Sequence, residues 1–226
     1  MNEFLISRPT IGHVAPRFKA KSTKGVIRFP EDYKGKWVIL FSHPADFTPV
    51  CTTELIMFMK DYHKFKALNT ELIALSIDSL YKHQMWTEDI EAMLKEEEQS
   101  EVSMAFPLIA DEDLTIAELY GNLHPNVSYT ETIRGVYIID PEGVIQLITY
   151  YPPNLGRNTN ELLRVIKGLQ RIDTHGVAIP ANWQEGEDVI DMPINDYKEE
   201  ADERLKQDKT LKKCLDWYLC LKEDEK

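Results

Sequence analysis

Hydrophobic and polar residues follow two periods along the chain, and each period predicts a kind of element. A continuous apolar run of strand length, such as WVILFS at 37–42, is typical of a strand buried on both faces of a sheet. Apolar residues that recur every three or four positions, as they do after Pro49, indicate an amphipathic helix. The pattern predicts strands at 37–42, 71–78 and 106–110, helices from about 49 and at 81–98, 113–121 and 158–173, and hairpins at 18–30 and 135–151.

Strands that alternate with helices predict the α/β class, with a central mixed sheet flanked by helices on both faces. The composition changes after residue 173, where prolines and charged residues break the pattern. We therefore expect a domain at 1–173 and a C-terminal extension at 174–226. The extension has too few apolar residues to fold alone and should pack on the domain or on a neighbouring subunit. A charged helix carrying Cys214 and Cys220 is expected near its end.

Composition narrows the classes of partner. The chain of 226 residues has a formal net charge of −12, which argues against nucleic acid or an anionic membrane, because phosphates require clustered Lys and Arg. No apolar run is long enough for a membrane helix and no signal peptide is evident, so a cytoplasmic, reducing location is expected. Scattered histidines and the lack of zinc or nucleotide motifs predict no metal and no cofactor.

Three cysteines in a reducing compartment are either inert or active in redox chemistry. Cys51 follows an expected strand, with Pro49 suited to the first turn of a helix and Thr48 to its N-cap. Its sulfur would then face unpaired backbone N–H groups at the positive end of the helix dipole, which favours the thiolate. The position indicates a nucleophile or a redox centre. The alternative is a small buried side chain that packs in the core.

The segment PADFTPVC, residues 44–51, matches the PxxxTxxC signature of the peroxiredoxins. Its surroundings, FSHPADFTPVCTTEL, are similar to those of the peroxiredoxin 6 (1-Cys-like) subfamily, which has archaeal and bacterial members. The resemblance extends over nearly the whole chain and includes TIRGVYIIDPEG and NWQEGEDVI. It implies a thioredoxin-like α/β fold with a C-terminal extension through which subunits dimerise.

The resemblance also implies roles for individual residues. Cys51 resembles the peroxidatic cysteine, whose thiolate attacks a peroxide and becomes a sulfenic acid. Thr48 would hydrogen-bond the thiolate and the peroxide, and Pro44 would shield the site from water. Arg134 matches the active-site arginine, which stabilises the thiolate and the charge on the departing oxygen. Arg157 matches a second arginine that would support substrate binding. Taken alone, either arginine would be assigned to a surface ion pair.

Two further residues near the signature are candidates. In this subfamily a histidine at the place of His43 lies beside the reactive sulfur, where it would orient the thiolate or bond to the oxidised form. The alternative for His43 is a strand-end histidine that is merely hydrogen-bonded. Glu54 is expected to join the hydrogen-bond network around the arginines.

Cys214 and Cys220 depart from the 1-Cys pattern. On one helix their spacing would separate the Cα atoms by roughly 9 Å along the axis, beyond the disulfide limit of about 7 Å. As a helical pair they would not bond to each other. Some archaeal members of the family carry such a pair, and there the distal cysteine resolves the sulfenic acid across a subunit boundary. This implies that Cys220 resolves Cys51, with Cys214 as helper or substitute. The alternative is that both cysteines only pack.

Together these features predict a thiol peroxidase that reduces hydrogen peroxide and organic hydroperoxides and is recycled by a thioredoxin-like thiol donor. The resemblance implies homodimers that assemble into decamers. Two alternatives stay open, a one-cysteine peroxidase without an internal resolver and a non-enzymatic redox sensor or holdase chaperone. A disulfide reductase is disfavoured, because the chain has no CxxC motif.

Overall fold

The computed structural model describes residues 8–99, 101–128, 130–192, 208–216 and 218–224. The chain divides into two compact units, residues 1–159 and residues 160–226. This division falls before the expected domain boundary at residue 173, because nearly all of the last long helix groups with the C-terminal unit. The first unit contains Cys51, and the second contains Cys214 and Cys220.

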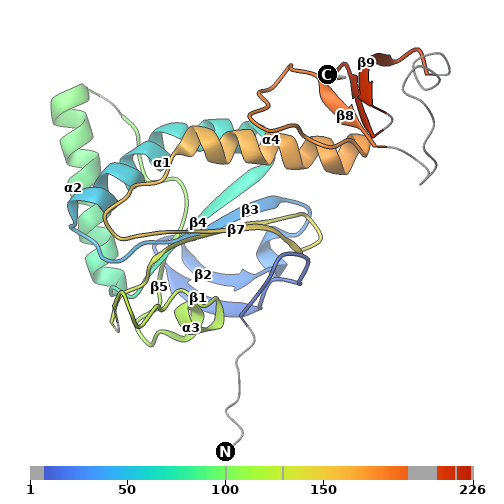
Figure 1. Ribbon diagram of the computed structural model, residues 1–226. Coiled ribbons are helices and arrows are strands. Elements are labelled where there is room, and N and C mark those ends of the chain that lie inside the picture. Colours follow the sequence, from blue (N-terminus) through green and yellow to red (C-terminus); the bar gives the residue numbers. More distant parts are fainter. Residues whose placement is uncertain (1–7, 100, 129, 193–207, 217, 225–226) are drawn as a thin grey trace, which may run out of the picture. The chain divides into compact units, whose positions relative to one another are not determined.

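A seven-stranded mixed sheet forms the centre of the first unit (Figure 1). Its strand order is β2-β1-β5-β4-β3-β6-β7, in which β3, β4 and β5 run parallel and the other neighbouring pairs are antiparallel. The predicted mixed sheet is confirmed, and the predicted hairpins are the pairs β1–β2 and β6–β7. The strands are β1 (Phe18–Ser22), β2 (Gly25–Phe29), β3 (Trp37–Ser42), β4 (Thr70–Ser76), β5 (Leu108–Ala110), β6 (Arg134–Ile139) and β7 (Ile145–Tyr151).

Helices cover both faces of this sheet. Successive side chains of a strand point to opposite faces, and β3 shows the consequence. Phe41 stacks on Phe58 of α1, whereas Leu40 belongs to a buried core that also contains Ile116 of α3. Accordingly, α1 and α3 lie on opposite sides of the sheet in Figure 1. The helical elements of this unit are η1 (Glu31–Tyr33, a 3-10 helix), α1 (Pro49–Ala67), α2 (Leu80–Glu98) and α3 (Thr115–Leu119).

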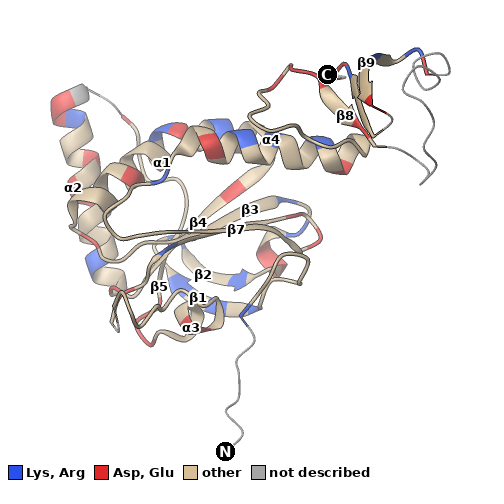
Figure 2. Cartoon of the chain, in the orientation of Figure 1, with Lys and Arg blue, Asp and Glu red and all other residues tan. Residues whose placement is uncertain are grey.

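The two long helices of the first unit are amphipathic, as their periodicity predicts. Leu55 and Met59 of α1 are buried four residues apart, as are Trp86, Ile90 and Leu94 of α2. Acidic and basic residues are mixed along both helices (Figure 2). Within the part of the chain that the structure describes, no helix is long and apolar enough to cross a membrane.

The second unit combines a helix with a small antiparallel sheet of strand order β8-β10-β9. A cluster of Val177, Trp183 and Val189, with Ile179 packed against it, forms its apolar core. The helix predicted at 158–173 is confirmed, but the predicted charged helix with the two cysteines is wrong, because that segment forms β9 and β10. The elements are α4 (Thr159–His175), β8 (Val189–Asp191), β9 (Leu211–Asp216) and β10 (Leu219–Lys222).

Candidate active site

Cys51 lies in the first turn of α1, after the loop that leaves β3. Thr48 has an extended backbone at the N-cap position and Pro49 is the first helical residue, as the sequence predicts. The thiol of Cys51 is free, and its side chain is fully buried. The first turn of a helix has unpaired backbone N–H groups and a positive partial charge, so it stabilises negative charge on this sulfur.

Arg134 places a second positive charge against the sulfur. Its Nη1 donates to Cys51 Sγ at 3.3 Å and to Glu54 Oε2 at 2.6 Å. Its Nε and Nη2 donate to the carbonyl oxygen of Pro153 at 3.1 and 2.8 Å. The guanidinium is buried, and its bonds to Glu54 and to the carbonyl oxygen of Pro153 hold it in place beside the sulfur. A thiolate at Cys51 would therefore have a fixed counter-charge.

Glu54 connects the two arginines that the sequence singled out. Arg157 donates to Glu54 Oε1 from its backbone N–H at 2.7 Å and from Nε at 2.8 Å, and to Oε2 from Nη2 at 2.6 Å. Burial alone would raise the pKa of Glu54, but Arg157 and then Arg134 hold that pKa below its usual range. The carboxylate therefore stays ionised and orients both guanidinium groups. Arg157 is thus linked to the sulfur through Glu54 and Arg134.

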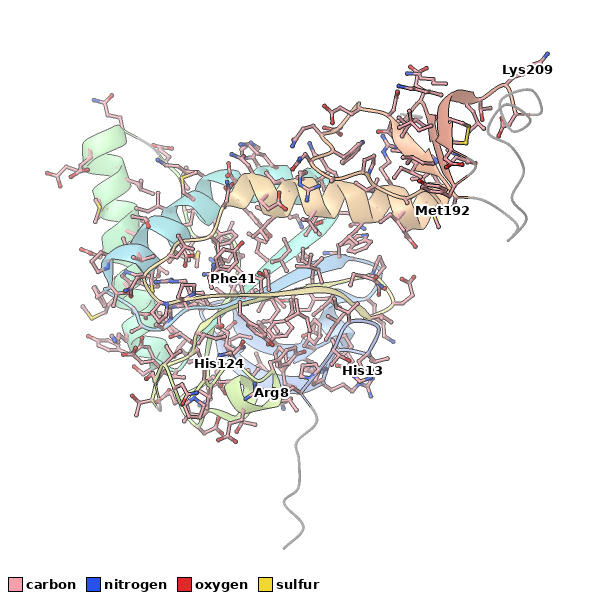
Figure 3. The ribbon with its side chains drawn as sticks, viewed as in Figure 1. Arg8, His13, Phe41, His124, Met192 and Lys209 are labelled. Carbon is pink, nitrogen blue, oxygen red and sulfur yellow. A yellow bond between two sulfur atoms is a disulfide. The ribbon has the colours of Figure 1, made fainter. Side chains whose placement is uncertain are left out.

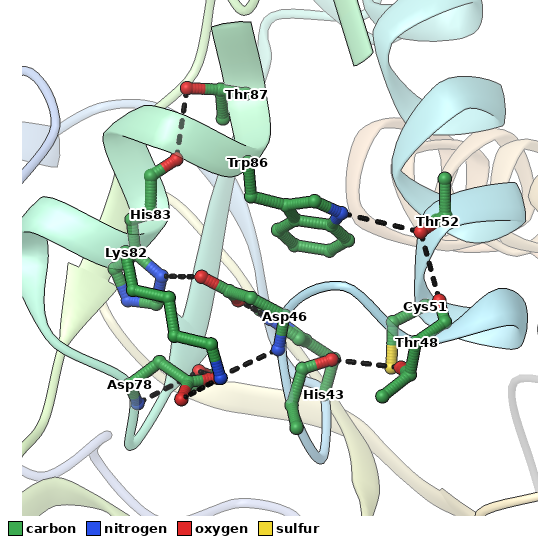
Figure 4. Close-up of polar contacts among 12 residues, drawn as sticks. His43, Asp46, Thr48, Cys51, Thr52, Asp78, Lys82, His83, Trp86 and Thr87 are labelled. Carbon is green, nitrogen blue, oxygen red and sulfur yellow. Dashed lines mark hydrogen bonds and ion pairs between the residues drawn. The ribbon is translucent and has the colours of Figure 1, made fainter. Parts of the chain in front are cut away.

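Thr48 lies beside Cys51 (Figure 4). Its Oγ1 donates a hydrogen bond to the carbonyl oxygen of Ala45 at 2.8 Å and makes no N-cap bond. Because the hydroxyl hydrogen is used in this way, the oxygen remains as an acceptor. Pro44, on the same loop, is buried.

Phe47 is a feature of the loop that the sequence did not reveal. Its φ of 58° lies in the left-handed region, where bulky residues are rare, and the residue is 49% exposed. Its ring lies 6.4 Å from that of Trp86, measured between centroids. Residue propensities give no signal for an aromatic residue held in this conformation.

His43 belongs to a buried chain of polar side chains beside the same loop (Figure 4). Its Nε2 lies 2.9 Å from Asp46 Oδ1, and Nδ1 of His83, on α2, lies 2.6 Å from Asp46 Oδ2. Burial lowers the pKa of His43. Burial would raise the pKa of Asp46, but the hydrogen bonds with His43 and His83 lower it. A hydrogen-bonded His43 is compatible with both roles considered from the sequence.

Asp46 and His83 are site residues that sequence reasoning missed. They are separated by 37 positions, and no motif connects them. Only the packing of α2 beside the loop brings them together. Among the described residues, no group of three or more His, Cys, Asp or Glu side chains is arranged to hold a metal ion.

Cys214 and Cys220 form a disulfide in the second unit (Figure 3). They are cross-strand partners in the pair β9–β10, with Cα atoms 4.0 Å apart. The expectation that they could not bond to each other was wrong, because it assumed one helix, whereas an antiparallel pair of strands brings the two positions face to face. Cys220 is fully buried and Cys214 is half-buried.

The groups at Cys51 define a reaction type. A buried thiol at a helix start, beside a fixed guanidinium, is a nucleophile whose attack is assisted where negative charge develops. The hydroxyl oxygen of Thr48 adds a hydrogen-bond acceptor at the same place. Such a site suits displacement at an electrophilic atom that carries a hydroxyl group.

Comparison with known proteins gives consistent matches over nearly the whole chain. The model of the AhpC/TSA family matches residues 11–148, and that of the C-terminal domain of 1-Cys peroxiredoxin matches residues 168–207. A peroxiredoxin of Methanosarcina mazei is 49% identical over 216 residues, which cover 96% of this chain and 98% of that one. A peroxiredoxin of Thermotoga maritima is 46% identical over 217 residues, covering 95% and 97%.

Solved structures agree with these matches. The Peroxiredoxin 6 of Arenicola marina has a TM-score of 0.84 and 36% identity, covering 96% of this chain and 99% of that one. A yeast mitochondrial 1-Cys peroxiredoxin has a TM-score of 0.82 and 38% identity, covering 95% and 99%. The predicted thioredoxin-like fold is confirmed, and the C-terminal extension consists of strands as well as a helix.

Proposed function

The chain belongs to the AhpC/TSA family of peroxiredoxins and is a peroxidase, and from this premise we propose that it reduces hydrogen peroxide and organic hydroperoxides through a sulfenic acid on Cys51. One observation carries the proposal. A free, buried thiol in the first turn of α1 lies 3.3 Å from Nη1 of Arg134. This contact supplies both a stabilised thiolate and a positive charge for the departing oxygen.

In the first step the Cys51 thiolate attacks the terminal oxygen of the peroxide. The S–O bond forms as the O–O bond breaks, and the departing oxygen takes a proton to leave as water or an alcohol. Thr48 Oγ1 accepts the hydrogen of the peroxide hydroxyl, since its own hydrogen is held by Ala45. Arg134 stabilises the charge on the departing oxygen while Glu54 keeps it in place. Pro44 limits the access of water.

Arg157 supports this step indirectly, through Glu54 and Arg134. Four of its N–H groups hold Glu54 and the carbonyl oxygen of Ser42. Its guanidinium also lies over the Phe41 ring, 4.9 Å from the centroid. We assign Arg157 the task of orienting Glu54, and through it Arg134, for substrate binding.

The second step returns Cys51 to the thiol. The thiol of Cys220 from a neighbouring subunit attacks the Cys51 sulfenic acid, which releases water and forms a Cys51–Cys220 disulfide. Cys214 then attacks the Cys220 sulfur and displaces the Cys51 thiolate. The product is the Cys214–Cys220 disulfide, which is the pairing present in the structure.

The third step reduces that disulfide with a thioredoxin-like dithiol donor. Cys214 is half-buried whereas Cys220 is fully buried, so the donor thiolate is expected to attack the Cys214 sulfur and to displace Cys220 as a thiolate. The second donor thiol then frees Cys214. The solved yeast relative is described with glutathione and thioredoxin systems, which supports a thiol donor of this kind.

The proposal extends to assembly and location. Transfer from Cys51 to Cys220 of a neighbour requires at least a homodimer, for which residues 174–226 are the proposed contact region. Decamers built from such dimers and a cytoplasmic location follow from the family resemblance and the reducing chemistry of the cycle. Size-exclusion chromatography with light scattering would measure the assembly directly.

Peroxide consumption and non-reducing gels test the cycle. The wild-type protein with a thioredoxin-like donor should consume many equivalents of hydrogen peroxide, and Cys51→Ser should consume none. Cys214→Ser should accumulate a subunit dimer linked between Cys51 and Cys220. Cys220→Ser should accumulate the Cys51 sulfenic acid.

The alternatives give different results in the same experiment. A one-cysteine peroxidase would carry added oxygen on Cys51 and would turn over with a donor in Cys220→Ser as well as in the wild type. A sensor or holdase would stop after one equivalent of peroxide whichever donor was present.

A further inference from the structure

His43, Asp46 and His83 come from three different parts of the first unit and meet in its interior. They lie at the end of β3, in the following loop and on α2, and their exposed fractions are 2%, 3% and 0%. Groups buried to this extent cannot exchange hydrogen bonds with bulk water, so every proton of the cluster must be accounted for within it.

The hydrogen-bond partners determine where those protons lie. His83 Nδ1 faces Asp46 Oδ2 at 2.6 Å, and His83 Nε2 faces the carbonyl oxygen of Ile109 at 3.1 Å. Against the effect of burial, the hydrogen bonds of Asp46 hold its pKa below the usual range, so its carboxylate is ionised and, like the carbonyl, only accepts hydrogen bonds. Both nitrogens of His83 therefore carry hydrogen. By the same reasoning His43 Nε2, which is 2.9 Å from Asp46 Oδ1, carries one as well.

We infer that His83 is a positioning residue that, as a buried imidazolium, keeps Asp46 ionised and thereby holds the proton of His43 on Nε2. Asp46 and His83 neutralise each other, so the cluster has no need of a second positive charge. His43 therefore stays neutral and its Nδ1 is a bare acceptor in the loop that leads to Cys51. This role rests on the proposed peroxidase function of that loop.

The same residues connect the loop to α2. Trp86 lies three residues after His83, and its ring is 5.3 Å from the His43 ring, measured between centroids. Its Nε1 donates to Thr52 Oγ1 in α1 at 3.3 Å. The face of α2 that carries His83 and Trp86 thus contacts the loop on one side and the Cys51 helix on the other. Loss of the imidazolium is expected to change both the proton on His43 and the position of the loop.

Nitrogen-15 NMR of histidine-labelled protein tests the proton assignment in the unaltered chain. At neutral pH we expect both His83 nitrogens to be protonated and His43 to be protonated at Nε2 alone. A bare nitrogen on His83, or a proton on Nδ1 of His43, would overturn the assignment. Because this measurement needs no peroxide chemistry, it gives a result even if Cys51 proves unreactive and the proposed function fails.

The variant His83→Gln tests the consequence. Gln is neutral, so Asp46 loses its counter-charge and His43 should take up a proton on Nδ1, which the same NMR spectrum reports. The second-order rate constant for oxidation of Cys51 by hydrogen peroxide should fall about tenfold. His63→Gln, the same substitution at an exposed histidine of α1, should change neither quantity. An unchanged rate in His83→Gln, or a lower rate with His43 still bare at Nδ1, would contradict the role.

Discussion

Cys51 and the Cys214–Cys220 pair are the cysteine sites of this chain, and the structure stabilises their sulfur atoms by different means. Cys51 is a free thiol with charged surroundings, in which Arg134, Glu54 and Arg157 are joined by short hydrogen bonds. Cys214 and Cys220 are held by a covalent bond between two strands of a small sheet.

In the proposed cycle this difference corresponds to a division of labour. A site that must attack an oxygen atom benefits from fixed charge around one sulfur. A site that must pass electrons to another protein benefits from two sulfurs that alternate between thiol and disulfide, one of them accessible. The first arrangement favours one reactive state of Cys51, whereas the second allows two stable states of the same strands.

Substitution of the cysteines should separate the two tasks most strongly. Cys51→Ser removes the nucleophile and should lower the rate of peroxide reduction to that of the uncatalysed reaction. Cys214→Ser should leave the first oxidation of Cys51 at the wild-type rate and block only the later turnovers. Stopped-flow measurement of the first turnover and steady-state assay with a donor distinguish the steps. Equal slowing of the first turnover in both variants would remove the distinction.

Arg134→Lys tests the charge at the first site. Lysine keeps a positive charge but lacks the planar donor set that holds Cys51, Glu54 and the carbonyl oxygen of Pro153 together. The rate constant for oxidation of Cys51 should fall about 100-fold. Arg17→Lys, at an exposed pair with Glu31, is the matched control and should leave the rate constant unchanged.

Glu54→Gln tests whether the network also stabilises the fold. Removal of the carboxylate leaves two buried guanidinium groups without this counter-charge. The free energy of unfolding, measured with urea at pH 7, should therefore fall by about 3–5 kcal/mol. Glu31→Gln, at the exposed pair, should have little effect. A loss at Glu54 no larger than at Glu31 would mean that the network serves chemistry alone.

The pH dependence of that stability has a defined sign. The pKa of Glu54 in the folded protein lies below its usual range, so its contribution is present above the unfolded pKa of about 4.3 and is lost as the pH falls through the folded pKa. The wild-type protein should therefore lose more stability than Glu54→Gln when the pH is lowered below this value. Urea unfolding at a series of pH values measures the difference.

Reduction of the disulfide should give the smallest effect and a local one. The bond closes a loop with a sequence separation of 6. For a loop of this length, the lower entropy of the unfolded chain stabilises the folded state by about 2 kcal/mol. Hydrogen exchange after reduction should lose protection at 211–222 and keep it at 37–42. Loss of protection in both regions would show that the two sites are coupled through the fold.

The sequence predicted the position of Cys51 well because the signals for it are local. Pro49 and Thr48 mark the start of α1, and the apolar run before them predicts β3, so the place of Cys51 in the first turn needs no tertiary information. The signature and the TIRG segment identified Arg134 as its partner. Asp46 and His83 escaped prediction because only the packing of α2 against the loop brings them together.

The secondary structure around Cys214 and Cys220 was predicted incorrectly, because its determinants are not local. The two residues between β9 and β10 are Trp217 and Tyr218, which give no turn signal of the Gly, Asn or Asp type. The segment is also rich in lysine and leucine, which favour helices. Its strands are stabilised by pairing with β8 and by the disulfide, and neither interaction can be read from local propensity.

Peptide mass mapping would test the proposed cycle at its key step, with the protein first reduced, then oxidised by one equivalent of hydrogen peroxide and finally alkylated. We expect Cys51 to be recovered as an alkylated thiol and Cys214 and Cys220 as a disulfide, because the pair supplies both electrons. Recovery of oxygen on Cys51 with Cys214 and Cys220 still alkylated as thiols would contradict this cycle.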